Sequence, residues 1–364
     1  MWWLVYCYIF LFSFVLAYLL VPLCRKLAGV TGFVSCPHPD KMGDNVVPLL
    51  GGLAIYGAFM LTVALHYLAL VLAQHTSLAN LVPAVVIKSI PGMLRQSQKL
   101  LAFLFGGLFI LGVGLVDDRW DLKPLIKLGC QVAVAIFVAH SGIRGILFIR
   151  NTLINSAATV VWIIVIINAF NFLDNMDGLC AGVAVIASLF FFFTSATLGQ
   201  FFISLMLIVL AGSVLGFLRY NFSPASIYMG DAGSMFIGYV LAILTVLATY
   251  YSKESQTIFP VILPVIVLAV PLYDLATVVL MRFRRGIPVF KASPHHFSFR
   301  LLSLGMNQRG ATLLIYLITF CSGIAALLLP RVGTTGAILI LIQTMAMLII
   351  IALLERYGRT RNPR

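Results

Sequence analysis

The feature that most constrains this chain is a series of apolar runs, each long enough to cross a lipid bilayer. An α-helical span needs about 20 mostly apolar residues, because the hydrocarbon is about 30 Å thick and each residue rises about 1.5 Å. Eleven segments of the 364-residue chain meet or nearly meet this length. They lie near residues 2–21, 50–73, 101–116, 125–140, 157–173, 180–198, 201–218, 233–251, 258–281, 311–329 and 334–354. The sequence therefore predicts an all-α, polytopic integral membrane protein with about eleven transmembrane helices.

The composition supports a membrane protein made of one continuous domain. Hydrophobic residues make up 62% of the chain and charged residues 10%, which leaves too little polar surface to coat soluble domains. Strand-like alternation is absent from the sequence, which excludes a membrane barrel, and no short-period repeat divides the chain. Residues 1–364 are therefore predicted to form a single integral membrane domain. Its first apolar run lacks the basic start and cleavage site of a signal peptide and is expected to stay attached.

The formal net charge of +13 could indicate nucleic-acid binding, but the Lys and Arg residues stand singly between apolar runs. We therefore expect no nucleic-acid partner. The six cysteines are scattered, without a Cys-x-x-Cys pair or a Cys/His array, so neither a disulfide framework nor a zinc site is predicted.

Lys and Arg residues are distributed unevenly between the two sides of the predicted helix bundle. With the N-terminus outside and the C-terminus cytoplasmic, 17 of the 24 fall on the cytoplasmic side, where the positive-inside rule expects the excess. Nine of the 11 acidic residues also fall on that side, with Glu254 outside and Asp274 within a span. Acidic residues do not follow this rule, so their gathering predicts a site there for a cation with an anionic substrate.

Asp117 and Asp118 directly follow the third apolar run, at the predicted membrane edge. Adjacent carboxylates repel each other, so a divalent cation or a basic group should neutralise them and leave one able to act as a base. The alternative is a structural pairing of both carboxylates with Arg119. Asp121 is interpreted as the N-cap of the next helix, with Pro124 in its first turn.

Polar residues recur at every third position where the fifth run ends. On a continuing helix, Asn171, Asp174 and Asp177 would spread over about 120° of one side. Such groups are costly near lipid, so they should face the protein interior or a watery cleft. Asn168, one turn earlier, is interpreted as an interhelical hydrogen-bonding residue.

Glycine-rich turns open two of the other runs. The turn from Gly230 to Ser234 begins the eighth run, where a helix N-terminus offers free N–H donors to an anion. Asp231 in this turn could be an N-cap alone, but the three other acidic loops on the same side favour a metal ligand beside a phosphate. Gly51 and Gly52 open the second run and predict close helix packing.

The segment 282–310 is the largest polar element on the cytoplasmic side and is the predicted lid over a site there. Its basic residues could hold anionic lipid. Its paired histidines, His295 and His296, could instead grip a diphosphate near neutral pH. Asp274 is predicted to be a structural partner for one of these basic groups.

Together these motifs resemble the polyprenyl-phosphate N-acetylhexosamine-1-phosphate transferase superfamily, over about residues 30 to 310. The matching pieces, in family order, are Pro48-x-x-Gly51-Gly52, Asp117-Asp118-Arg119, Asn168-x-x-Asn171-x-x-Asp174-x-x-Asp177-Gly178-Leu179, Met229-Gly230-Asp231-x-Gly233-Ser234, Pro271-x-x-Asp274 and His296-Phe297-Ser298-Phe299-Arg300-Leu301. Several separated motifs in one order make the resemblance specific.

The resemblance implies an integral membrane enzyme of the cytoplasmic (inner) membrane. Such enzymes move a sugar 1-phosphate from a UDP-sugar onto undecaprenyl or another polyprenyl phosphate and release UMP. They require Mg²⁺, for which Mn²⁺ is a substitute ion. The active site would face the cytoplasm, and the acceptor would arrive from the membrane lipid of the inner leaflet. A homodimer is among the assemblies that the sequence leaves open.

The resemblance also assigns roles to individual residues. Asp231 is then the metal ligand, and Asp117 and Asp118 are catalytic, handling the lipid phosphate or acting as base. The other assigned residues bind substrate: the nucleotide end is held by Asn171, Asp174 and Asp177, the diphosphate or sugar by His296 and Arg300, and the lipid phosphate by Lys41. His296 is counted among the catalytic residues as well.

Three positions depart from the family pattern. Asn175 stands where the family usually has Gly, Phe299 where it has a second histidine, and Ser35 where it has an acid. The first two touch the predicted substrate pocket, so they leave the sugar in question and admit an altered or weakened activity.

The histidine motif bears on the choice of donor. The string from His296 to Leu301 is closer to the His-x-x-His-Arg pattern of the GlcNAc-1-phosphate branch than to the three histidines of the phospho-MurNAc-pentapeptide branch. UDP-GlcNAc or a related UDP-HexNAc is therefore the expected donor, and phospho-MurNAc-pentapeptide transfer is the alternative. A secondary transporter is a further alternative, disfavoured because the acids cluster at one membrane edge rather than at the midplane.

Overall fold

The computed structural model describes residues 2–35, 46–73, 97–145, 151–250, 257–288 and 296–361, with the side chains of 73 and 356–361 left out. Lys41, His295 and the other residues between these ranges lie outside the described part of the chain.

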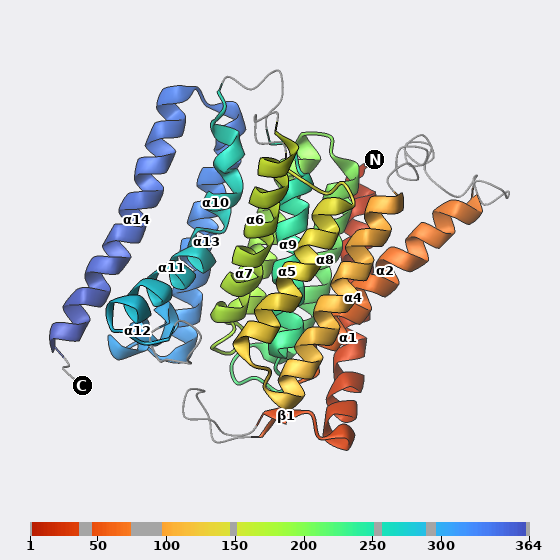
Figure 1. Cartoon of the computed structure of the whole chain (residues 1–364), viewed down its shortest axis with the longest axis horizontal. Helices are drawn as coiled ribbons and strands as arrows, with labels where there is room; N and C mark the ends of the chain where they lie inside the picture. Colours follow the sequence, from red (N-terminus) through yellow and green to blue (C-terminus); the bar gives the residue numbers. More distant parts are fainter. Residues whose placement is uncertain are drawn as a thin grey trace.

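The described residues are almost entirely helical (Figure 1). The first half of the bundle consists of α1 (Trp2–Thr31), α2 (Gly51–Ala73), α4 (Ser97–Trp120), α5 (Pro124–His140), α6 (Thr152–Leu173) and α7 (Leu179–Thr197). The second half consists of α8 (Phe201–Asn221), α9 (Gly230–Leu247), α10 (Leu263–Val267), α11 (Ala269–Arg284), α12 (Phe297–Ser303), α13 (Gln308–Leu328) and α14 (Thr334–Arg361), with short 3₁₀ turns at Phe259–Ile262 and Leu329–Arg331.

Each of the eleven predicted runs lies mainly in helix over its described residues, which confirms the all-α membrane fold. Within the described ranges, nine helices are long and apolar enough to cross a membrane. A tenth candidate is the pair Phe259–Val267 and Ala269–Arg284, which is bent by 71° between its two halves. The remaining run is α5, an apolar helix of 17 residues. The start of α1 and the end of α14 lie at opposite ends of the bundle (Figure 1).

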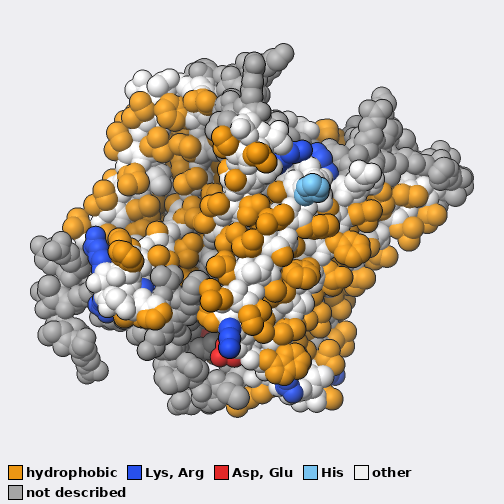
Figure 2. Space-filling model, viewed as in Figure 1, with side chains coloured by type: hydrophobic (Ala, Val, Ile, Leu, Met, Phe, Trp, Pro, Cys, Tyr) orange, Lys and Arg blue, Asp and Glu red, His pale blue; other side chains and the backbone are white. Residues whose placement is uncertain are grey.

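The bundle is built around α9. Over an apolar stretch of 18 residues in this helix, 83% of the residues are buried. The helix packs against α2, α4 and α6. By contrast, α14 forms an outer edge of the molecule (Figure 1), and only 22% of the residues in its apolar 18-residue stretch are buried. Apolar side chains cover the flank of the bundle, while charged ones show near its ends (Figure 2). Such an apolar flank suits contact with lipid chains.

A two-stranded ribbon lies at the lower end of α1 in Figure 1. Val34–Ser35 (β1) pairs antiparallel with Val47–Pro48 (β2), in the register Val34 to Pro48. The sequence-based interpretation contains no strand here, because two-residue strands are too short to show alternation. The ribbon places the start of α2 against the loop before α9, where the Tyr228 N–H donates to the Pro48 carbonyl at 2.8 Å.

The contact between α4 and α9 is so close that only glycine fits on one side of it. A Cβ atom added to Gly114 would lie 2.3 Å from the Cα of Ala232, which is backbone and cannot rotate away. Gly112, on the same helix, has no neighbouring atom within 4 Å of such a Cβ.

We predict that Gly114→Ala destabilises the protein by roughly 1–3 kcal/mol, because the extra methyl group forces the two helices apart. Gly112→Ala is the matched control, and it should leave stability unchanged or slightly raise it through better helix propensity. Thermal unfolding of the purified variants in detergent measures both effects. Equal midpoints for the two variants would contradict the close contact.

Candidate active site

Lys127 is the residue that brings the predicted acids together. Its ammonium lies 2.7 Å from Oδ2 of Asp117 and also donates to Oδ2 of Asp231 and, at 3.2 Å, to Oδ1 of Asn171. The lysine is on α5, and its three partners come from α4, α9 and α6. The side chains of Lys127 and Asp117 are 15% and 9% exposed, whereas that of Asp231 is 33% exposed. One positive charge therefore joins four helices at a partly buried point, and acidic side chains show beside a basic one at the lower end of Figure 2.

The sequence-based prediction missed Lys127, which it treats only as one of the basic residues on the cytoplasmic side. The sequence feature that indicates its role is that Lys127 is the only Lys, Arg, Asp or Glu residue in the apolar helix α5. An ionisable residue in such a helix needs a partner and indicates a functional site.

Asp118, the neighbour of Asp117, binds the start of α9 instead of the lysine. Its Oδ1 accepts from the Asp231 N–H at 2.7 Å and its Oδ2 from the Ala232 N–H at 3.1 Å. These are orphan donors of a helix N-terminus. The free N–H groups that the sequence analysis assigns to an anion are therefore bound by Asp118. Asp231 is not the N-cap of this helix, because Met229 occupies that position.

Two further interpretations of this loop are wrong. Asp121 is not the cap of α5, because Lys123 holds the N-cap position without a side-chain bond, although Pro124 does begin the helix. Asp121 instead forms the turn after α4, with φ at 48°. Arg119 does not pair the two carboxylates. Its guanidinium donates to the Gly32 carbonyl at 2.7 Å and lies over the ring of Phe33.

The polar string after Asn168 is not one helical face, because α6 ends at Leu173. Asp174 and Asp177 lie in the turn before α7. This turn ends at Gly178, whose backbone is in the left-handed conformation with φ at 74°. Asn168 itself donates to Oε1 of Gln131 on α5 at 2.6 Å, which confirms the interhelical hydrogen bond.

Asp174 and Asp177, in the turn between α6 and α7, form a second cluster of acidic side chains. Asp177 accepts at Oδ2 from the Ala225 N–H at 3.0 Å. Burial raises the pKa of the half-buried Tyr228, and the nearby carboxylates of Asp177 and Asp174 raise it further. Two acids of the predicted nucleotide site therefore lie near Tyr228, in the loop that leads into α9.

The glycine pair that opens α2 packs closely, as predicted. The N–H groups of Gly51 and Gly52 donate to the Tyr228 and Met229 carbonyls, each at 2.9 Å. A Cβ at Gly52 would lie 2.3 Å from the nitrogen of Gly233. The pair therefore supports the backbone on which Asp231 stands.

His296 is held at the start of α12 by Asp274, which confirms the predicted role of that acid. The His296 Nδ1 lies 2.9 Å from Oδ2 of Asp274, and the Phe297 N–H donates to Oδ1 at 2.6 Å. In the tautomer with the proton on Nδ1, the ring donates to Asp274 and Nε2 is the acceptor nitrogen. The ring also meets Phe172 and Phe299 edge-on, at centroid distances of 5.6 and 6.3 Å. Phe299 therefore supplies an apolar edge where the family usually has an imidazole.

Asn175, another departure from the family pattern, ties the acidic turn to α12. Its Oδ1 accepts from the Ser298 hydroxyl, and its Nδ2 donates to the Phe172 carbonyl at 2.7 Å. A glycine at this position could make neither bond. One side chain therefore links the turn between α6 and α7 to α12.

Arg300, which the resemblance assigns to the diphosphate or sugar, is bound to protein partners. Its side chain is 6% exposed, its Nε lies 3.1 Å from Oε1 of Glu355, and an Nη donates to the Thr277 hydroxyl at 2.9 Å. The structure therefore places Arg300 between α11, α12 and α14.

A hard divalent metal ion requires several oxygen ligands around one point. Among the described residues, no three His, Cys, Asp or Glu side chains form a group that could hold a metal ion. However, two carboxylates and the amide oxygen of Asn171 do converge on one cation, the ammonium. Oxygen donors of this kind are those that a hard divalent ion prefers. The donor chemistry therefore fits such an ion, and Asp231 is the more exposed of the two carboxylates.

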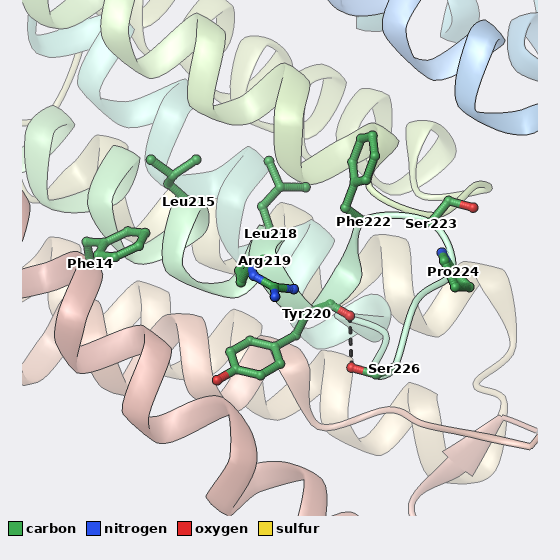
Figure 3. A pocket seen from close by; sticks show the side chains of 9 residues that line it. All are labelled: Phe14, Leu215, Leu218, Arg219, Tyr220, Phe222, Ser223, Pro224 and Ser226. Atoms are coloured by element: carbon green, nitrogen blue, oxygen red, sulfur yellow. Dashed lines mark hydrogen bonds between the residues drawn. The ribbon is translucent and has the colours of Figure 1, made fainter.

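A separate groove of about 690 Å³ lies between α1 and the end of α8 (Figure 3). Its lining consists of Phe14, Leu215, Leu218, Arg219, Tyr220, Phe222, Ser223, Pro224 and Ser226. None of these is acidic, so the groove is distinct from the acid cluster.

Comparisons with known proteins agree with this geometry. Residues 100–249 match glycosyl transferase family 4. Over 328 residues the chain is 31% identical to the probable undecaprenyl-phosphate N-acetylglucosaminyl 1-phosphate transferase of Bacillus subtilis (strain 168), covering 88% of this chain and 84% of that protein. The chain belongs to glycosyl transferase family 4.

Other members of the family show similar coverage. A decaprenyl-phosphate N-acetylglucosaminephosphotransferase of Mycobacterium tuberculosis (strain CDC 1551 / Oshkosh) is 32% identical, over 80% of this chain and 74% of that protein. An undecaprenyl-phosphate alpha-N-acetylglucosaminyl 1-phosphate transferase of Yersinia pestis is 26% identical, over 94% and 86%. The predicted family and enzyme class are confirmed, and the transporter alternative is set aside.

We predict that Lys127→Met destabilises this family 4 protein, because it leaves Asp117 buried without its counter-charge. Removing one partner of a fully buried pair costs about 3–5 kcal/mol, and the loss should be smaller here because Asp231 is partly exposed. Thermal unfolding in detergent measures the loss. Lys123→Met is the control, since Lys123 is exposed at the same helix start.

The double variant Lys127→Met/Asp117→Asn separates charge from packing. It should recover part of the lost stability, since the unpaired buried charge is gone. No recovery would show that the lysine acts through packing of its stem.

A double-mutant cycle tests the bond between Asn175 and Ser298. We expect Asn175→Ala and Ser298→Ala together to cost about 1 kcal/mol less than the sum of the single variants, because both break the same hydrogen bond. Ser303→Ala, whose hydroxyl bonds the Arg300 carbonyl within α12, is the control partner and should be additive with Asn175→Ala. Additivity in both cycles would contradict the link.

Proposed function

We propose that this chain transfers GlcNAc 1-phosphate, or a related HexNAc 1-phosphate, from a UDP-sugar to undecaprenyl or another polyprenyl phosphate. An oxygen of the acceptor phosphate bonds to the phosphorus next to the sugar, and the bond from that phosphorus to UMP breaks. The products are UMP and the lipid-diphosphate-sugar that initiates cell-envelope glycan synthesis. The names of the three relatives support both the transferred group and the acceptor class.

The observation that carries the proposal is the convergence of Asp117, Asp231 and Asn171 on Lys127 in a family 4 chain. Phosphoryl transfer needs little covalent chemistry from the protein, so positioning and charge stabilisation supply most of the catalysis. A rigid cluster of opposite charges at the ends of four helices suits this task, because its charges need no reorganisation during the reaction.

We propose Mg²⁺ as the cofactor, with Mn²⁺ as its substitute. Asp231 would hold the ion, with Asp117 and Asn171 as neighbouring oxygen donors. When bound, the ion would neutralise the donor diphosphate. Asp118, which caps α9 through two backbone N–H groups, would keep Asp231 at its place in the first turn.

The remaining side chains suit the two substrates. Asp174 and Asp177 lie near Tyr228 and are proposed to hold the nucleotide end. The Nε2 of His296 is proposed to contact the diphosphate or sugar, because Asp274 holds the other ring nitrogen. Lys41 is proposed to contact the lipid phosphate.

The site is proposed to face the cytoplasm, with the N-terminus outside and the C-terminus cytoplasmic. The uneven loop charge supports this orientation, because 17 of the 24 Lys and Arg residues then face inward. The bacterial relatives support the cytoplasmic membrane as the location.

The experiment that tests the function uses purified protein, undecaprenyl phosphate and Mg²⁺ with a panel of UDP-sugars. We expect UMP release that requires the lipid, the metal and a HexNAc donor, with UDP-GlcNAc the best of the panel. If UDP-MurNAc-pentapeptide is the one donor that gives UMP release, the protein would instead be assigned to the phospho-MurNAc-pentapeptide branch. Absence of release with every donor would overturn the proposal.

Asp231→Asn should lower turnover roughly 100-fold at low Mg²⁺, because the amide keeps the shape but loses the charge that holds a hard cation. Asp121→Asn is the matched control. Asp121 is an exposed acid in the turn after α4, and Asn also tolerates its positive φ. The measurement is UMP release against Mg²⁺ concentration, on variants shown by thermal unfolding to be folded. Near-normal turnover of folded Asp231→Asn at low Mg²⁺ would show that Asp231 does not bind the metal ion.

A further inference from the structure

The outer helix α14 carries one acidic residue, Glu355, and that residue is buried. The helix faces mostly outward, yet the Glu355 side chain is only 8% exposed. Its Oε1 lies 3.1 Å from Nε of Arg300, and its Oε2 accepts from the Tyr273 hydroxyl at 3.2 Å. The contact with Arg300 is an ion pair rather than an aligned hydrogen bond.

Arg300 faces the same cluster from α12. Its guanidinium lies over the ring of Tyr273 at 5.8 Å, and an Nη donates to the Thr277 hydroxyl. Taking both charges out of water costs free energy that their attraction recovers only with good geometry, so such a pair is expected to add little net stability. We call Arg300, Glu355, Tyr273 and Thr277 the latch.

The latch matters because α12 is only seven residues long and cannot hold its own conformation. Asp274 fixes its start through the His296 ring and the Phe297 N–H. The latch fixes its end, using Tyr273 and Thr277 from the same helix as Asp274 and a carboxylate from α14. His296 lies at the first of these two anchors, and Ser298 lies between them.

We propose that Glu355 is a positioning residue of the transferase site, acting through Arg300 to hold α12 and therefore His296 in place. This role rests on the proposed function. Arg300 then acts on the protein rather than on the donor diphosphate, and the last helix of the chain becomes part of the catalytic support.

The rival interpretation is that Arg300 contacts the substrate, and the two interpretations predict opposite results. If Arg300 binds the diphosphate, every replacement of Arg300 stays inactive, and Glu355→Gln has little effect. In the latch, Glu355→Gln lowers kcat about 10- to 100-fold with little change in KM, because a shift of about 1 Å at His296 has effects of that size.

The decisive variant is Arg300→Met/Glu355→Leu, which replaces the pair by apolar side chains of similar size. Such replacements of buried pairs are often neutral or stabilising, so the double variant should fold even where Arg300→Met alone, with Glu355 left uncompensated, does not. We expect the double variant to turn over at least about tenfold faster than Arg300→Met, which is about 1.4 kcal/mol in activation free energy. Arg309→Met is the control, because Arg309 is exposed and donates to the Ser223 carbonyl, and it should keep wild-type kcat and KM.

The assay is UMP release, with thermal unfolding of each variant measured alongside. A double variant that is folded but as inactive as Arg300→Met would overturn the latch and assign Arg300 to the substrate. Unchanged kcat in Glu355→Gln would overturn it as well. Absence of UMP release from the wild-type protein would instead overturn the proposed function and this role with it, so the two failures are distinguishable.

Discussion

The ammonium of Lys127 is the point on which the site depends. It stands between two carboxylates and an amide oxygen at the ends of four helices, mostly out of water. Without it, Asp117 would be a nearly buried charge beside a second one, and the low local dielectric would make their repulsion strong. The lysine therefore lets the helix ends come close enough for glycines such as Gly114 to pack on α9. Its position also gives the acid cluster a defined geometry before any substrate arrives.

Adjacent residues on a helix point about 100° apart, and this explains how the Asp117-Asp118 pair divides its tasks. Asp117 faces Lys127, and Asp118 faces the N-terminus of α9, where backbone N–H groups bind it. The sequence showed that the pair needed positive partners but not that one partner would be a helix end. Only the packing of α4 against α9, which is set by contacts far apart in the chain, decides that. The same limit hid Glu355, whose partner lies 55 residues earlier, at Arg300.

The fold itself was predictable because the bilayer imposes one length on every crossing, and apolar runs of that length are visible without any partner. Predictions failed where local polar chemistry competes with the helix. The three-residue spacing from Asn171 to Asp177 predicted one helical face, but Asp and Asn side chains offer the backbone alternative bonds, and α6 ends at Leu173. Asp121 failed as a cap for a related reason, since Asp is among the few residues that tolerate a positive φ and can form a turn. Asn168 and Asp274 were predicted correctly, because a lone polar group in an apolar helix must find a partner in the protein.

The two departures from the family pattern that were expected to touch the substrate both contact the first turn of α12 or its N-cap. Asn175 bonds Ser298 from the acidic turn, and Phe299 sets its ring against His296 within the same segment. Where the family pattern has a second imidazole, this chain has an apolar edge, and where it has a flexible glycine, this chain has a hydrogen bond. The amide of Asn175 bonds protein groups on both of its atoms, and Phe299 adds an apolar ring, so both changes strengthen contacts within the protein. In the described part of this segment the imidazole is that of His296, and Asp274, Phe172 and Phe299 all contact its ring, so the protein itself sets the orientation of the ring.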